Sequence, residues 1–170
     1  EQLLNRGRPG PASEIVETMR EINPNWEALP ELTERTETLL QLEQDYDRAR
    51  DLADQGQYAD ALAIFQSVEA AQPGLWDVRS QIAAMEERVQ VETLMAQGEA
   101  AFQSQNWNEV ISAYEGVLAL DPGLDNPSMK EQLIQAYLNV MNSVVQANDP
   151  PLEAVLQAED YSRRASALIP

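Results

Sequence analysis

Residues 56–73 read GQYADALAIFQSVEAAQP, and residues 105–122 read QNWNEVISAYEGVLALDP. The second segment has the same spacing of aromatic, apolar and proline residues as the first, although most of the residues differ. The matching positions all lie 49 residues apart. They are Tyr58 and Trp107, Ala61 and Val110, Phe65 and Tyr114, Val68 and Val117, and Pro73 and Pro122. A fixed interval of this size is typical of a repeat array, in which one unit cannot bury its apolar face alone.

The same interval leads back toward the N-terminus to a third copy, PASEIVETMREINP, at residues 11–24. Its residues lie 49 positions before the glycine, the packing positions and the proline of the first clear copy. They are Gly7, Ala12, Val16, Met19 and Pro24. We therefore predict a degenerate N-terminal repeat over residues 7–24.

The apolar residues of each copy are spaced at i, i+3 and i+4, which indicates helices that each bury one face. No segment alternates apolar and polar residues in the manner of a half-buried strand. Clusters of glycine, proline and asparagine separate the helical segments. These clusters lie at residues 6–11, 23–25, 72–74, 121–127 and 148–151. The sequence therefore predicts an all-α fold.

Two long segments without proline, residues 31–54 and 76–103, lie between the copies. In the second segment, two apolar groups lie on nearly opposite faces of a helix with about 100° per residue. The first group is Val78, Ile82, Met85 and Val89, and the second is Val91, Leu94, Met95, Gly98, Ala101 and Phe102. We infer that the first half of this helix closes the preceding hairpin and the second half opens the next. A break near Glu87–Gln90 is the alternative.

The spacing resembles that of the tetratricopeptide repeat family, whose two-helix unit has a turn glycine followed by aromatic and small residues and a proline. Gly56, Tyr58, Ala61, Phe65, Val68 and Pro73 match this spacing. In the second copy Gln105 replaces the glycine and Val110 replaces the small residue. Ala49 and Gly98 lie where the first helix of each repeat takes a small residue. The resemblance covers clear repeats at residues 42–73 and 91–122, although the family's usual period is about 34 residues.

The resemblance implies an open right-handed α-solenoid of about seven helices, in which antiparallel helical hairpins are joined by elongated helices. We expect one repeat domain over residues 1–170 that is cut from a larger protein. In its long period it resembles arrays found in large multidomain bacterial proteins. Residues 128–170 form a C-terminal capping hairpin in this interpretation. Its second helix has an apolar stripe of Ala158, Tyr161, Ala165 and Leu168.

The chain of 170 residues is 44% hydrophobic, enough for a substantial core, and carries a formal charge of −18. Such an acidic surface cannot neutralise phosphates, so we expect neither nucleic acid nor an anionic membrane surface as a partner. A basic or apolar protein or peptide is compatible with it. The absence of cysteine means that the redox compartment cannot be inferred, and both cytoplasmic and extracytoplasmic locations stay open.

The sequence contains neither histidine nor cysteine, which removes the commonest general base, the usual zinc ligands and the usual nucleophile pairs. Asp121, Asp125 and Asn126 in DPGLDNP could suggest calcium, but these residue types are also those that turns and helix caps use. Adjacent acids such as Glu86 and Glu87 point apart on a helix, as solvated residues do. We therefore predict a protein that is not an enzyme and that has no cofactor or metal site.

The three tryptophans allow two interpretations each. Trp107 occupies a packing position of the repeat, so a core role is favoured. Trp26 and Trp76 follow turn prolines, and each could be an exposed anchor for a partner or could pack over a helix start.

In proteins that this chain resembles, the first helix of each repeat lines a concave surface that binds a peptide. The corresponding positions here are Glu43, Tyr46, Asp47, Arg50, Asp54, Glu92, Met95, Glu99, Phe102 and Gln103. The lysines and asparagines that hold a partner's terminal carboxylate in chaperone-binding members are missing, so the resemblance implies a basic or apolar peptide. A solvated face without a partner is the alternative.

The resemblance thus predicts a non-catalytic protein-interaction or scaffolding module. A ligand-sensing or regulatory extracytoplasmic domain of a bacterial membrane receptor or kinase is the second hypothesis.

Overall fold

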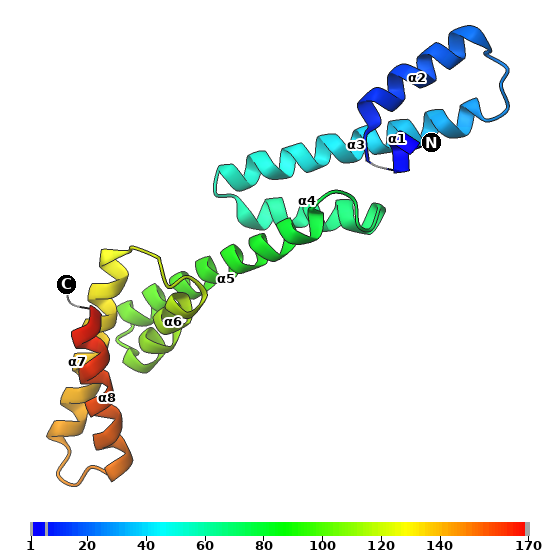
Figure 1. Cartoon of the computed structure of the whole chain (residues 1–170). Helices are drawn as coiled ribbons and strands as arrows, with labels where there is room; N and C mark the ends of the chain where they lie inside the picture. The colour runs from blue at the N-terminus through cyan, green and yellow to red at the C-terminus, as the bar shows by residue number, and fades with distance from the viewer. Residues whose placement is uncertain (1, 6, 169–170) are drawn as a thin grey trace. The chain divides into compact units, whose positions relative to one another are not determined.

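The computed structural model describes residues 2–5 and 7–168, and this part of the chain forms eight helices and no strand (Figure 1). The helices are α1 (Gln2–Asn5), α2 (Pro9–Ile22), α3 (Leu29–Asp54), α4 (Tyr58–Ala71), α5 (Val78–Gln103), α6 (Trp107–Leu120), α7 (Pro127–Gln146) and α8 (Leu152–Leu168). The predicted all-α class is confirmed. The helix beyond the expected seven is the four-residue α1.

The helix bounds repeat at the interval found in the sequence. Helices α2, α4 and α6 have 14 residues each, and each begins 49 residues after the one before. Helices α3 and α5 have 26 residues each and begin at Leu29 and Val78, again 49 residues apart. Because the helices start and end at equal intervals, the repeated sequence pattern encodes a repeated local structure.

The residue two positions before α2, α4 and α6 has a left-handed backbone in all three copies. The φ angles are 64° at Gly7, 77° at Gly56 and 59° at Gln105. This conformation reverses the chain before the next helix, and glycine adopts it without a steric penalty. Gln105 has a Cβ atom and carries the cost of this conformation, which is about 1 kcal/mol.

We therefore expect Gln105→Gly to stabilise the chain by about 1 kcal/mol, because it relieves the left-handed strain and removes no contact of the core. Urea denaturation followed by circular dichroism measures the change. Gly56→Ala is the matched control. No heavy atom lies within 4 Å of a Cβ built at Gly56, so only the backbone penalty acts there and the sign should reverse. Destabilisation by Gln105→Gly would contradict the prediction.

Contacts within the chain divide it into two units, residues 1–88 and 89–170, and the division falls inside α5. Each unit is described by itself below. The expected single domain over residues 1–170 stays a prediction.

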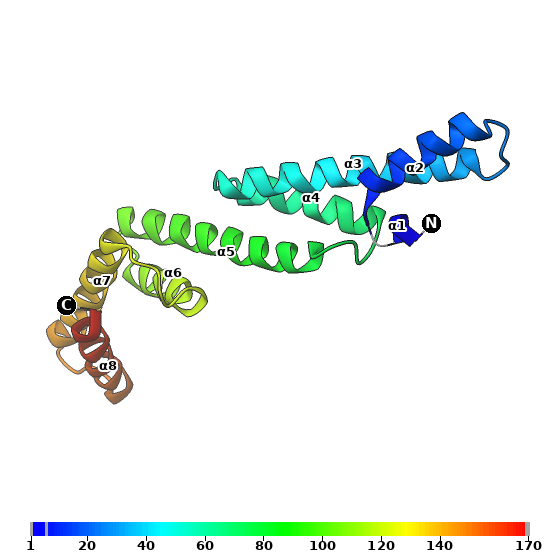
Figure 2. The same cartoon turned by 45° about the horizontal axis from the view of Figure 1, so that its top comes forward.

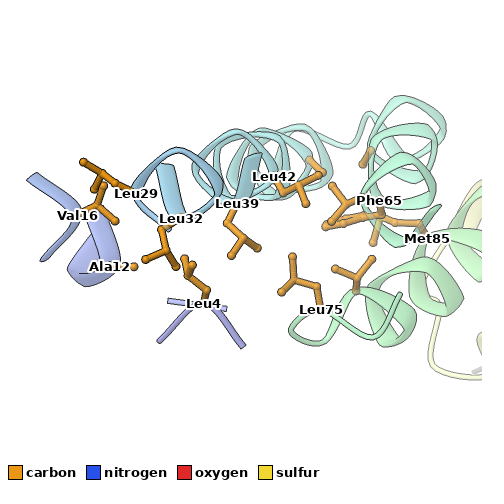
Figure 3. Packing of buried hydrophobic residues seen from close by; sticks show 14 residues of the cluster. Leu4, Ala12, Val16, Leu29, Leu32, Leu39, Leu42, Phe65, Leu75 and Met85 are labelled. Atoms are coloured by element: carbon orange, nitrogen blue, oxygen red, sulfur yellow. The ribbon is translucent and has the colours of Figure 1, made fainter. Parts of the chain in front are cut away.

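In the first unit, α2 and α4 both pack against α3. Figures 1 and 2 show α2 beside the N-terminal part of α3 and α4 beside its C-terminal part. The buried apolar residues form one row that runs from Val16 and Leu29 to Phe65 and Met85 (Figure 3). Thr36 of α3 is also buried, and its hydroxyl donates to the Leu32 carbonyl at 2.6 Å. The row thus holds α2, α3 and α4 together through a single apolar core.

In the second unit, α7 packs against both α6 and α8. Its core contains residues from α5, α6, α7 and α8. They are Ala101, Val110, Ile111, Tyr114, Val117, Met129, Leu133, Ala136, Tyr137, Tyr161 and Ala165. The Tyr137 and Tyr161 rings stack with centroids 5.0 Å apart. The predicted C-terminal helical hairpin is therefore present, and its role as a cap stays a prediction.

Helix α5 buries different faces in its two halves, as the sequence predicted. Val78 and Met85 belong to the core of the first unit, with Ile82 packed against it. Ala101 belongs to the core of the second unit, with Leu94 and other residues of the second apolar group packed against it. The helix is continuous from Val78 to Gln103, so the alternative of a break near Glu87–Gln90 is wrong.

Candidate interaction surface

Helix α3 presents four of the residues predicted to bind a peptide as one stripe. They are Glu43, Asp47, Arg50 and Asp54, which recur every three or four positions. Asp47, Arg50 and Asp54 are exposed, and Glu43 is half-buried. Three carboxylates and one guanidinium give the stripe a negative charge. This stripe, which we call the α3 acidic stripe, can attract a cation from solvent.

Tyr46, the fifth predicted residue on α3, lies at the edge of the stripe and is engaged within the fold. Its ring meets the ring of Phe65 edge-on at 5.6 Å and the ring of Trp76 at 5.0 Å. Its hydroxyl donates to the Asp77 carboxylate at 2.5 Å. Tyr46 therefore joins α3 to the start of α5, and only part of its surface can meet a partner.

Both members of this pair have shifted pKa values. Burial, followed by the hydrogen bond to Asp77, raises the pKa of Tyr46 to about 12. The hydrogen bond from Tyr46, followed by the bond from Gln81, lowers the pKa of Asp77 below its ordinary value. The pair therefore stays a neutral phenol bound to a charged carboxylate at neutral pH.

The predicted residues on α5 divide into exposed and core positions. Glu92, Glu99 and Gln103 are exposed and lie on one stripe. Met95 and Phe102 are half-buried and pack against the core, and the Phe102 ring meets the Trp107 ring at 5.8 Å. Their contribution to a partner surface is correspondingly smaller.

Glu99 is the centre of a hydrogen-bond network between α5 and its neighbours. Gln103 donates to one carboxylate oxygen at 3.1 Å, and Gln132 of α7 donates to the other at 3.0 Å. The Tyr114 hydroxyl in turn donates to Gln132. The bond from Gln132, followed by the bond from Gln103, lowers the pKa of Glu99. Glu99 is therefore charged and oriented, although it is exposed.

The predicted site residues are thus brought together within each unit. Those on α3 belong to the first unit, and those on α5 belong to the second. Within a unit, each group forms an acidic stripe with an aromatic or apolar residue at its edge. Such a stripe can bind cationic groups, but it offers no convergent acid and base.

Two partners of these residues, Asp77 and Gln132, were not among the predicted residues. Each lies more than 30 positions from the side chain that it contacts. The only sequence signal was the position of Asp77 directly before a helix, which indicates a capping role rather than a bond to Tyr46.

A second polar cluster, also missing from the sequence prediction, joins α6, α7 and α8. The Glu115 carboxylate accepts hydrogen bonds from the Tyr137 hydroxyl at 2.5 Å and from Arg164 at 2.7 Å. Arg164 also pairs with Asp160 at 2.6 Å. Burial, followed by the bond to Glu115, raises the pKa of Tyr137. Arg163 lies 3.7 Å from Asp160 as well, so two carboxylates face two guanidinium groups, and the cluster connects α8 to α6 and α7.

A pocket of about 600 Å³ lies in the second unit between the start of α7 and the end of α8. Its lining is mainly apolar and includes Ile134 and Leu168, with Lys130 paired to Asp125 at 3.0 Å. No polar side chain is left buried without a hydrogen-bond partner in the part of the chain that the structure describes. Asp125, Lys130 and Glu131 also line the pocket, so its wall combines apolar and charged side chains.

The DPGLDNP loop uses its polar residues for local structure. Asn126 caps α7 by accepting the backbone N–H of Met129 at 3.0 Å, and Asp121 accepts the N–H of Gly123 at 3.2 Å. Asp125 pairs with Lys130. Within residues 2–5 and 7–168, no three carboxylates come close enough together to hold a metal ion.

The tryptophans have three different environments. Trp107 packs against the core of the second unit. Trp76 donates its indole N–H to the Gly7 carbonyl at 2.9 Å and contacts Tyr46, so it has a packing role. Trp26 is 39% exposed and lines a small pocket with Met19 and Ile22. The anchor interpretation therefore stays open for Trp26 alone.

None of the helices, over the residues that are described, combines the length and the apolar character needed to span a bilayer.

No family model, no curated protein and no solved structure matches the chain significantly.

Proposed function

We propose that the chain is a non-catalytic, tetratricopeptide-like scaffold whose helical hairpins stack as a right-handed α-solenoid and whose first helices bind a basic or apolar segment of a partner protein. The observation that carries this proposal is the α3 acidic stripe, because three of its four residues are exposed and it lies at the positions where such repeats bind peptides. The recurrence of helix bounds every 49 residues supports the repeat architecture.

Charge determines which partner the stripe favours. Asp47 and Asp54 lie seven positions apart on one side of α3, so a cationic segment can meet both. The formal charge of −18 reinforces the attraction over a longer range at low ionic strength. An acidic segment would be repelled by both effects.

The test uses a fluorescein-labelled 14-residue peptide with alternating lysine and alanine, and a twin in which glutamate replaces every lysine. Fluorescence anisotropy should show binding of the lysine peptide alone. Reversing both charges, in Asp47→Arg/Asp54→Arg, should weaken binding by at least about ten-fold, which corresponds to about 1.4 kcal/mol.

Glu14→Arg/Glu21→Arg is the matched control, because Glu14 and Glu21 are also exposed, also seven positions apart, and lie on α2. This control changes the net charge by the same amount and should retain the affinity. Equal weakening by both double variants would show attraction by the overall charge alone and would contradict a site on α3. Absence of binding by the lysine peptide would contradict the proposal altogether.

A further inference from the structure

The four-residue helix α1 ends in the same way as the long helices α3 and α5. The backbone N–H of Gly7 donates to the Leu4 carbonyl and that of Arg8 to the Leu3 carbonyl, both at 3.0 Å. This pair of bonds, around a residue with a left-handed backbone, closes a helix end. The same pair closes α3 one period later and α5 two periods later. Helix α1 therefore has the place of the last turn of a long helix.

Helix α1 is much shorter than the helices whose place it takes. Helices α3 and α5 have 26 residues each. A four-residue helix is about 6 Å long, whereas the 14-residue helix α2 is about 21 Å long. Helix α1 can therefore lie beside only the beginning of α2. It leaves most of one side of α2 without the first helix that α4 and α6 have beside them.

Helix α6 shows which side of such a 14-residue helix the long helix covers. A Cβ at Gly116 would lie 3.1 Å from Cδ1 of Leu94, so the second half of α5 runs past this position. Ala113 lies three positions earlier on the same side of α6 and is buried. The long helix thus closes the side of α6 that carries Ala113 and Gly116.

The corresponding side of α2 is open to solvent. Ile15 is the counterpart of Ala113 one repeat unit earlier in the array, and it is 45% exposed. Ile22, two turns further along the same side, is 79% exposed. Met19 lies between them and is half-buried, whereas its counterpart Val117 is fully buried. Each apolar residue on this side of α2 is thus more exposed than its size and polarity favour.

Trp26, in the loop after α2, continues the open side. Its counterpart Leu75 is buried in one core with Leu39 of α3, and Figure 3 shows the two side chains pointing toward each other. Trp26 is 39% exposed and lines a pocket of about 260 Å³ at the end of α2. We call the following four residues the α2 open face: Ile15, Met19, Ile22 and Trp26.

The other side of α2 is packed as in the later copies. Ala12 and Val16 are buried in the same core as Leu29 and Leu32 of α3, and Figure 3 shows Val16 beside Leu29. The exposure of α2 is therefore confined to the side on which a long helix packs in the later copies. A general looseness of the first copy would not produce this pattern.

We propose that the α2 open face is a docking surface for a long helix of the same kind as α3 and α5, with α1 as its last turn. The helix would present apolar residues 11, 7 and 4 positions before Leu4. Leu42, Tyr46 and Ala49 have these positions relative to Ala53, the counterpart of Leu4 in α3. The inference rests on the repeat architecture proposed above and not on peptide binding by the α3 acidic stripe.

Two physical arguments favour a helix joined to α1 over a separate molecule. Covalent connection gives the helix a high effective concentration at the α2 open face, so a modest apolar contact is enough to hold it there. A second copy of this chain carries a formal charge of −18 and is repelled by the first. The open face is also continuous with α1, which already packs against α2 and α3.

The test extends the full chain at its N-terminus by TLLQLEQDYDRA, a copy of residues 38–49 placed directly before Glu1. The copy then stands 49 positions before its original. The control extension has Leu39→Gln, Leu42→Gln and Tyr46→Gln in the copied segment, which keeps a good helix former but removes the apolar stripe. Relative to this control, amide hydrogen exchange at Ile15 and Met19 should slow by at least about ten-fold. The indole signal of Trp26 in ¹⁵N-HSQC spectra should shift.

Ile15→Gln/Ile22→Gln in the extended chain should abolish the slower exchange of Met19, because it removes the apolar area on which the new helix docks. Val155→Gln/Leu156→Gln is the matched control, since it makes the same kind of change at exposed apolar residues of α8. This control should keep the slower exchange. Circular dichroism should show the same helix content for both double variants.

Three results would overturn the proposal. Equal exchange in the two extended chains would show that a longer α1 gains nothing from the α2 open face. Equal loss in both double variants would show a nonspecific apolar effect. Self-association of the unextended chain in sedimentation, lost only in Ile15→Gln/Ile22→Gln, would assign the face to a second copy. Binding of the lysine peptide by the unextended chain measures the proposed function separately, so either proposal can fail without the other.

Discussion

Replacing Gly98 by alanine is expected to lower the free energy of unfolding by about 2 kcal/mol. A Cβ at this position would lie 2.2 Å from Cε1 of Tyr114, and the Tyr114 ring is buried and cannot swing into solvent. Overpacking of this kind costs about 1–3 kcal/mol. Displacing the ring also weakens the hydrogen bond from Tyr114 to Gln132, which adds about 1 kcal/mol. The higher helix propensity of alanine offsets about 1 kcal/mol.

Gly116→Ala is the control for Gly98→Ala, because it makes the same chemical change in a helix of the same unit. Its Cβ would approach the end of the half-buried Leu94 side chain at 3.1 Å, and that side chain can move aside. The gain in helix propensity should then leave the stability within about 1 kcal/mol of the unmodified chain. Urea denaturation measures both variants. Equal stability of the two would show that the Tyr114 ring does not fill the space beside Gly98.

Replacing Phe65 by alanine is expected to destabilise the first unit by about 3–5 kcal/mol, the range for a buried phenylalanine. The side chain is fully buried between α3 and the first half of α5, where Figure 3 shows it beside Met85. Its removal leaves a cavity and takes away the edge-on contact with Tyr46. The hydrogen bond from Tyr46 to Asp77 should weaken as a consequence, because the Tyr46 ring loses the wall against which it packs.

Phe65→Leu separates loss of volume from loss of the aromatic ring. It should cost less than about half of the alanine substitution, since most of the apolar volume is retained. Near-ultraviolet circular dichroism of Tyr46 and Trp76 should change more in Phe65→Ala than in Phe65→Leu. A loss below about 1 kcal/mol in Phe65→Ala would contradict the placement of Phe65 in the core.

The candidate surface was only partly predictable from sequence. Spacing placed Asp47, Arg50 and Asp54 on one side of a helix, and the structure has them exposed. The same spacing could not show that Tyr46 is bound to Asp77 or Glu99 to Gln132, because these partners lie 31 and 33 positions away. Contacts at that separation depend on how two helices pack, which a local pattern does not encode.

The exposed apolar residues beside the turn between α7 and α8 illustrate the same limit. Val145 and Leu152 have the size and polarity of core residues, as the buried Leu133 and Val117 have. Their exposure shows that no described helix packs over these two positions.

The amino-acid sequence by itself predicted the all-α class, the recurrence at 49-residue intervals, the places of the turns and the two buried faces of α5. These features depend on interactions within a few turns of helix, which short-range spacing and turn residues encode. Only the tertiary structure decided which side chains on those faces are held by distant partners and which apolar residues stay in solvent. Burial depends on what packs against a face, and in this chain that is set by helices that are far apart in sequence.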